Sequence, residues 1–308
     1  MLGSIITKLR TPVRIARHGI REDSQLDRIV RRFSDNKLGL VGLALMIVYL
    51  LVSIVGPLFI TKDPSSMNAE ARYQAPTPAY PFGTDSVGRD VFARVVSGAR
   101  KSLRVAIATI LIAGVLGVSF GLVAGYFRGK VDAAVMRVVD ILLAFPSILL
   151  ALVVVSILGP GLNKAILALG VAFTPSMIRI TRASSLSVRE EEYVLAARAY
   201  GEGSLGIMFR EMLPNVVSAV IVQGTLVFAW AILAEASLSF LGLSAQPPTS
   251  TWGVMVAEGQ NNFMIAPWAT LFPGLAIVLT VLGLTFFGVG LRDALDPRTD
   301  VDTTGGNV

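Results

Sequence analysis

Few side chains in this sequence have the types and spacing that catalysis or metal binding requires. The chain has no cysteine and a single histidine, His18, which lies in a polar N-terminal stretch. Disulfides, thiolate metal sites and cysteine nucleophiles are therefore excluded, and a histidine triad or a His-rich metal site is not expected. The aspartates and glutamates are scattered, with no two placed as a general acid and base. We predict no catalytic residues and no metal ligands.

A phosphate-binding loop is also missing from the sequence. The nearest segment, GARKS at 98–102, lacks the glycine before Lys101, and no strand is predicted in front of it. A P-loop needs Gly-x-x-x-x-Gly-Lys-Ser/Thr, because its backbone amides and its lysine surround the phosphates. If this protein uses ATP, we expect ATP and Mg²⁺ to bind a separate ATPase, and no cofactor to bind this chain.

Two sets of charged residues lie in or beside apolar segments. Glu235 stands between Ala234 and Ala236 in a long apolar run, where a carboxyl group is rare and faces a cavity or a partner. It is either a pathway or gate residue or a buried hydrogen-bonding acid. Arg137 and Asp140 are three residues apart on one helix face, and we predict a structural ion pair rather than a proton relay.

The composition indicates the elements that carry these residues. Of 308 residues, 53% are hydrophobic and 16% charged, against about a quarter charged in soluble domains. The mean hydropathy is +0.67. About 20 apolar residues cross a bilayer as a helix, and six segments qualify: 38–60, 103–126, 138–158, 163–181, 216–243 and 269–291. We therefore predict an all-α membrane protein with about six transmembrane helices, the third kinked at Pro146.

The distribution of basic residues predicts the orientation of the chain. Nine Lys and Arg residues precede the first span, and with the N-terminus inside, 19 of the 27 fall on cytoplasmic segments. Seven basic residues between Lys62 and Arg104 are an exception, in a long loop that obeys the rule weakly. We predict a multi-pass protein of a bacterial cytoplasmic membrane with both termini cytoplasmic. The N-terminal stretch is not expected to be a cleavable signal peptide, and nucleic acid is not an expected partner.

The second predicted span carries small residues at every fourth position. They are Thr109, Ala113, Gly117, Gly121 and Gly125. Such a strip allows transmembrane helices to approach closely. We predict helix packing there, either within the subunit or between subunits.

The polar segments are too short to form a second core. We divide the chain into a basic cytoplasmic tail at 1–37, a first span at 38–60, an outer loop at 61–102, a core membrane domain at 103–298 and a C-terminal tail at 299–308. A cytoplasmic loop at 190–215 belongs to the core.

This cytoplasmic loop has an unusual pattern of small residues. Ala196, Ala197 and Gly201 lie together if the segment is helical, and a face with so little side chain allows another protein to approach the backbone. Glycines at 201 and 203 predict a bend. An apolar stripe then follows, consisting of Leu205, Met208, Phe209 and Met212. The loop is either a docking surface or an ordinary hairpin with incidental alanine and glycine.

The same loop resembles the EAA loop of bacterial ABC importer permeases. The pattern Glu-Ala-Ala, three residues, Gly, nine residues, then an apolar residue, x, Leu-Pro is matched from Leu195 to Pro214 with the same gaps. Leu195 replaces the first glutamate and Glu211 replaces the apolar residue. The resemblance implies that this loop is a coupling helix, with contacts to an ATPase at Ala196, Ala197, Gly201, Glu202, Gly203, Leu213 and Pro214.

Further motifs narrow the resemblance to the second-permease type of the dipeptide/oligopeptide/nickel group. They are FGTD at 82–85, GRD at 88–90, GARKSL at 98–103, MRVVD at 136–140, LSFLGL at 238–243, QPP at 246–248, WG at 252–253 and GLRDALDPR at 290–298. Val289 stands where that group has an aspartate, so the role of that carboxylate is either lost or kept by other residues here. Thr84 and Asp85 have a simpler reading as turn and helix-cap residues.

The resemblance implies a type I ABC importer permease fold and a set of partners. These are a homologous second permease, two ABC ATPases and an extracytoplasmic solute-binding protein, for which the outer loop 244–268 is a candidate contact, together with membrane lipid. The expected cargo is a short peptide, with nickel or another small solute as the alternative. An ion-driven secondary transporter would show more intramembrane charges and an inverted repeat, and a membrane scaffold would not need the loop.

Overall fold

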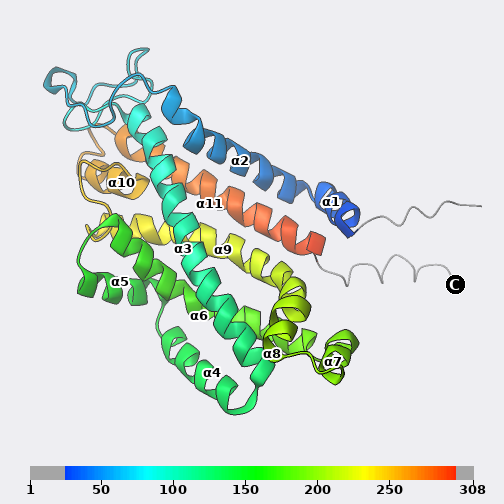
Figure 1. Ribbon diagram of the computed structural model, residues 1–308. Helices are drawn as coiled ribbons and strands as arrows, with labels where there is room; N and C mark the ends of the chain where they lie inside the picture. The colour runs from blue at the N-terminus through cyan, green and yellow to red at the C-terminus, as the bar shows by residue number, and fades with distance from the viewer. Residues whose placement is uncertain (1–24, 296–308) are drawn as a thin grey trace, which may run out of the picture.

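The computed structural model describes residues 25–295, and within them all regular secondary structure is helical (Figure 1). The predictions for the two tails fall largely on 1–24 and 296–308, outside the described residues. The main helices are α1 (Gln25–Asp35), α2 (Lys37–Ile54), α3 (Val91–Phe127), α4 (Gly129–Leu143), α5 (Ser147–Leu158), α6 (Leu162–Val188), α7 (Glu192–Ala199), α8 (Ser204–Gly206), α9 (Leu213–Phe240), α10 (Trp252–Gln260) and α11 (Trp268–Leu295). A π-helical segment, Ile207–Met212, joins α8 to α9.

The long helices agree with the predicted spans except at the third span, which is divided into α4 and α5. Between residues 25 and 295, five helical stretches are long and apolar enough to cross a membrane, and α4 with α5 makes a sixth only as one span bent by 89°. The kink predicted at Pro146 is therefore a complete break between two helices, and the segment begins at Gly129 rather than at 138. Pro146 precedes α5, and because proline lacks an N–H and its ring clashes with the preceding turn, the helix ends at Leu143 and restarts at Ser147.

The boundary of the outer loop also differs from the prediction at 102. Helix α3 begins at Val91, because the Asp90 carboxylate accepts a hydrogen bond from the Ala93 amide at 3.2 Å and caps the helix. The Asp85 carboxylate likewise accepts from the Val87 and Arg89 amides, both at 3.0 Å. The turn interpretation is confirmed for Asp85, whereas the cap of α3 is Asp90 rather than Thr84 or Asp85.

The strip of small residues on α3 packs within the subunit. Helix α6 runs along it, with Met177, Thr181 and Ser185 placed against Gly117, Gly121 and Gly125 in turn. A Cβ on Gly121 would lie 2.5 Å from the Cβ of Thr181. Ala113 continues the strip and is fully buried beside Met177. The question left open by the sequence is answered, since the strip holds α3 against α6.

Helix α2 packs on α11 through a second set of glycines (Figure 1). A Cβ on Gly39 would lie 3.0 Å from the Cα of Gly290, and one on Gly283 would lie 2.7 Å from the Cβ of Leu45. Asn36 Nδ2 also donates to the Asp293 carboxylate at 2.9 Å. The N-terminal span is thereby fixed to the last helix.

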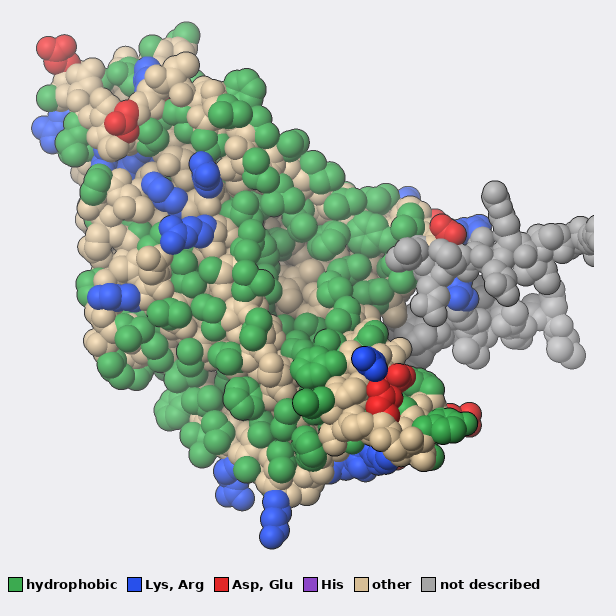
Figure 2. All heavy atoms as spheres, viewed as in Figure 1, with side chains coloured by type: hydrophobic (Ala, Val, Ile, Leu, Met, Phe, Trp, Pro, Cys, Tyr) green, Lys and Arg blue, Asp and Glu red, His purple; other side chains and the backbone are tan. Residues whose placement is uncertain are grey.

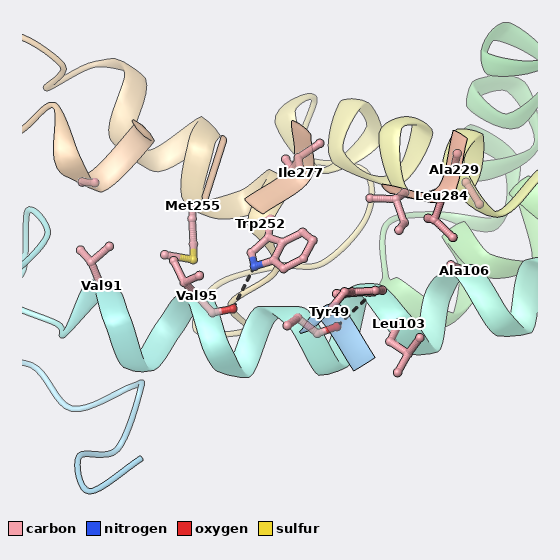
Figure 3. Close-up of a cluster of buried hydrophobic side chains, with 14 of the residues drawn as sticks. Tyr49, Val91, Val95, Leu103, Ala106, Ala229, Trp252, Met255, Ile277 and Leu284 are labelled. Atoms are coloured by element: carbon pink, nitrogen blue, oxygen red, sulfur yellow. Dashed lines mark hydrogen bonds between the residues drawn. The ribbon is translucent and has the colours of Figure 1, made fainter. Parts of the chain in front are cut away.

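At the end of the bundle where α3 begins, aromatic side chains pack in a buried cluster (Figure 3). Trp252, the first residue of α10, points at α3 and donates from Nε1 to the Val95 carbonyl at 2.9 Å. The Tyr49 hydroxyl of α2 donates to the Ala99 carbonyl at 3.4 Å. These contacts join α2, α3 and α10 in one buried cluster.

Candidate functional site

The loop singled out by its small residues forms a helix and a bend at one end of the bundle, beside the C-terminal end of α3 and the N-terminal end of α9 (Figure 1). Helix α7 ends at Ala199, and Gly201 has φ +83°, a conformation that residues with a Cβ rarely adopt. The chain then enters α9 through α8 and the π-helical segment. The predicted helix and glycine bend are confirmed, whereas the second helix is continuous with α9.

One side of this loop is buried against the bundle. Val194, Ile207, Met208 and Met212 pack with Leu122 of α3 in a single cluster. Ala197 lies at the edge of the cluster and is half-buried. The loop is therefore a rigid projection of the bundle rather than a free connection, because its own apolar side chains hold it to α3.

The other side of the loop is exposed and apolar, and we call it the docking surface. It consists of Leu195, Ala196, Tyr200, Gly201, Gly203, Leu205 and Phe209. Tyr200 is 93% exposed, and a Cβ added at Gly201 or Gly203 would meet nothing within 4 Å. Exposed apolar residues grouped in this way mark an interaction surface.

The predicted contact residues divide between these two sides. Ala196, Gly201 and Gly203 belong to the docking surface, and Pro214 is exposed at the start of α9, whereas Ala197, Glu202 and Leu213 are half-buried. The predicted apolar stripe also divides, because Met208 and Met212 face α3 while Leu205 and Phe209 face outward. Sequence spacing alone could not separate the two sides, since both are apolar.

Charged residues connect the loop to the C-terminal end of α3. The Arg198 guanidinium lies 5.5 Å from the ring centroid of Tyr126, and Arg128 Nη2 lies 2.7 Å from a carboxylate oxygen of Glu190. Burial, and after it the nearby charges of Arg128 and Arg198, lowers the pKa of the Arg189 guanidinium. Arg128, Arg189 and Arg198 therefore lie near one another beside the loop, with Glu190 paired to one of them.

Glu235 lies deep in the bundle and is 1% exposed. Its Oε1 accepts hydrogen bonds from the hydroxyls of Ser239 at 2.6 Å and Ser244 at 3.1 Å. Ser244 belongs to the segment between α9 and α10, so the carboxyl group joins that segment to α9. Of the two interpretations of Glu235, a pathway or gate residue or a buried hydrogen-bonding acid, this geometry favours the second.

The predicted ion pair between Arg137 and Asp140 is not formed. Asp140 Oδ1 instead lies 2.9 Å from Arg179 Nη2 on α6, and within residues 25–295 no ion pair joins Arg137. One turn away, Arg182 binds both carboxylate oxygens of Asp132, through Nη2 at 2.6 Å and through Nε. Both aspartates of α4 therefore pair across helices, an arrangement that spacing along one helix cannot reveal.

Comparison with known proteins gives consistent matches over nearly the whole chain. A family model described as the binding-protein-dependent transport system inner membrane component matches residues 117–301. A second model, the N-terminal TM domain of oligopeptide transport permease C, matches residues 24–76.

Individual relatives cover most of the chain. The dipeptide transport system permease protein DppC of Alkalihalophilus pseudofirmus is 44% identical over 87% of this chain and 88% of its own length. The di/tripeptide transport system permease protein DppC of Pseudomonas aeruginosa is 39% identical over 89% of this chain and 93% of its own length.

Among solved structures, the MetNI methionine ABC transporter in an inward-facing conformation is similar in fold. The TM-score is 0.55 at 19% identity, and the match covers 66% of this chain and 97% of the other. At this identity the likeness concerns the arrangement of the helices.

Proposed function

Since this chain belongs to the family of binding-protein-dependent transport system inner membrane components, as a permease subunit of an ABC importer, we propose that it carries short peptides across the cytoplasmic membrane into the cell. It is a multi-pass membrane protein of a family of permeases, which are not themselves enzymes. One observation carries the peptide assignment: relatives that are 39% to 44% identical over nearly nine tenths of this chain are named dipeptide or di/tripeptide permeases.

In this proposal the docking surface couples ATP hydrolysis by partner subunits to movement of the transmembrane helices. Two separate ATPases bind ATP and Mg²⁺, and one of them contacts the docking surface from the cytoplasm. Because the loop is packed on Leu122 of α3 and continues into α9, a displacement of α7 moves both helices together. Rocking of these helices against those of a homologous second permease then opens the pathway to one side at a time. A solute-binding protein delivers the peptide on the outer side, and both termini lie in the cytoplasm.

The exposed glycine at 203 allows a direct test of this route. Its φ is −68° and its surroundings are open, so a larger side chain fits without backbone strain while it obstructs an approaching protein. We expect Gly203→Trp to abolish dipeptide uptake by reconstituted vesicles that contain the complete importer, with the protein still folded.

Lys130→Trp is the matched control, since Lys130 is exposed beside the α3–α4 turn and outside the docking surface. It should leave uptake unchanged. Full uptake in Gly203→Trp would show that no ATPase couples through this surface. Nickel uptake in place of dipeptide uptake by the wild-type importer would contradict the peptide assignment and leave the coupling intact.

A further inference from the structure

The outer basic residues are the exception to the charge rule that predicts the topology, and in the structure two of them, Arg89 and Arg94, are neutralised by carboxylates. Arg89 lies 2.6 Å from Asp85 and 2.9 Å from Glu258, and Arg94 contacts the same two carboxylates, Glu258 at 2.7 Å. Both arginines are buried. These two arginines hold the outer segment to α10. Because Asp85 and Glu258 neutralise their charges, they are not available to bind another anion.

A second group of outer cations has no acidic partner among the described residues. Arg100 and Arg104 are exposed on one face of α3, and Lys164 is exposed at the start of α6. The Arg104 guanidinium donates to the neutral Asn163 side chain at 2.9 Å, which brings the ends of the two helices together. Figure 2 shows Lys and Arg side chains gathered over the outer part of α3 without an acidic side chain among them. We call Arg100, Arg104 and Lys164 the outer cation cluster.

The outer cation cluster lies where both helices become apolar. After Arg104, α3 has no charged residue from 105 to 127, and after Lys164, α6 has none from 165 to 178. Charged residues at such a boundary stand at the depth of lipid headgroups, because the hydrocarbon core excludes them. The cluster is therefore placed at the level of the outer-leaflet phosphates.

An exposed apolar stripe continues the same face of α3 toward the membrane centre. Below Arg104 it consists of Ile107, Leu111 and Val115, which are 44%, 61% and 64% exposed. The rise from Arg104 to Val115 is about 16 Å at 1.5 Å per residue, about half the thickness of the hydrocarbon core. On α6 a similar stripe follows Lys164, at Leu167 and Val171. The apolar surface beneath the cations thus matches one leaflet in length.

We propose that this face binds an anionic phospholipid of the outer leaflet, with its phosphate among Arg100, Arg104 and Lys164 and an acyl chain along the stripe of α3. A lipid places a negative charge and an apolar chain at the depths where the protein presents cations and exposed aliphatic side chains. The site gives a role to three of the basic residues on the outer side. It is independent of the transported solute and of the ATPases.

The proposal is tested by native mass spectrometry of the full chain, purified together with the proteins that remain bound to it. Equal amounts of phosphatidylglycerol and phosphatidylethanolamine are added, and the ratio of the two bound lipids is measured. We expect a preference for phosphatidylglycerol that falls about fivefold for each cation removed. Arg100→Gln, Arg104→Gln and Lys164→Gln combined should therefore lower it by about a hundredfold.

Arg72→Gln is the matched control, since Arg72 is an exposed outer arginine whose Nε is bound to the Ser86 carbonyl. It should keep the preference, as should Arg100→Lys with Arg104→Lys, which retains the charge. Should the triple variant fail to fold, the same ratio is measured for the wild type at increasing salt concentration. Because salt screens the attraction between the cations and the lipid phosphate, the preference for phosphatidylglycerol must then fall.

An unchanged ratio in the triple variant, or a wild-type ratio indifferent to salt, overturns the proposal. A second outcome also overturns it. If the variants Arg104→Cys and Leu111→Cys crosslink efficiently to another polypeptide of the assembly, this face is covered by protein rather than by lipid.

Discussion

Gly121 of α3 lies directly against Thr181 of α6, so closely that a Cβ on the glycine would be 2.5 Å from the threonine Cβ. The same close approach is repeated one turn before, at Gly117 and Met177, and one turn after, at Gly125 and Ser185. Inside a bilayer, lipid competes equally well for apolar surface, so helices associate through dense packing. This contact is therefore a main source of stability in the bundle.

Gly121→Leu is expected to destabilise the protein strongly. The added side chain must separate α3 from α6, and overpacking of this kind costs about 1–3 kcal/mol or more. Gly114→Leu is the matched control, because Gly114 lies on the same helix and a Cβ there would meet nothing within 4 Å. The thermal midpoint in detergent should fall for the first variant alone, and equal midpoints would contradict the packing role.

Gly201→Ala should destabilise the loop and Gly203→Ala should not, although both sites have room for a Cβ. Gly201 has φ +83° and Gly203 has φ −68°, and a left-handed conformation costs an alanine about 1 kcal/mol. We expect faster hydrogen exchange over 190–215 in Gly201→Ala and wild-type exchange in Gly203→Ala. Identical exchange in the two variants would show that the bend does not depend on this backbone conformation.

Glu235→Gln should lower the stability of the protein much less than Glu235→Leu. The glutamine carbonyl can still accept from Ser239 and Ser244, whereas leucine leaves two buried hydroxyls without their acceptor, at about 1–3 kcal/mol. Thermal unfolding gives the comparison. Loss of peptide uptake in Glu235→Gln with an unchanged midpoint would point instead to a pathway or gate role for this carboxyl group.

Asp85→Asn is expected to loosen the outer end of the bundle. It removes one of two carboxylates that neutralise the buried Arg89 and Arg94, and breaking a buried ion pair costs about 3–5 kcal/mol. Limited proteolysis of the outer segment 61–90 should accelerate. Asp63→Asn is the control, since Asp63 is exposed and its carboxylate accepts hydrogen bonds from Ser65 rather than from an arginine. The cleavage rate of this variant should match the wild type. Cleavage at the wild-type rate in both variants would mean that the ion pairs of Asp85 with Arg89 and Arg94 are not needed to hold the segment 61–90 in place.

The position of most spans follows from the sequence. A helix must satisfy its own backbone groups in lipid, so an apolar run of sufficient length predicts a crossing, as in α2, α6, α9 and α11. The break near Pro146 and the bend at Gly201 also follow, because both are local properties of one residue. The angle of 89° between α4 and α5 does not, since neighbouring helices set it.

The partners of the side chains were decided by the tertiary structure alone. Asp140 has Arg137 three residues away, yet it pairs with Arg179, 39 residues along the chain, because the packing of α4 on α6 brings that guanidinium closer. Likewise, the small residues of α3 predict that a helix packs there, and only the fold shows that the helix is α6. Spacing along a chain specifies which face a residue occupies, while the partner of that face depends on how distant segments are arranged in space.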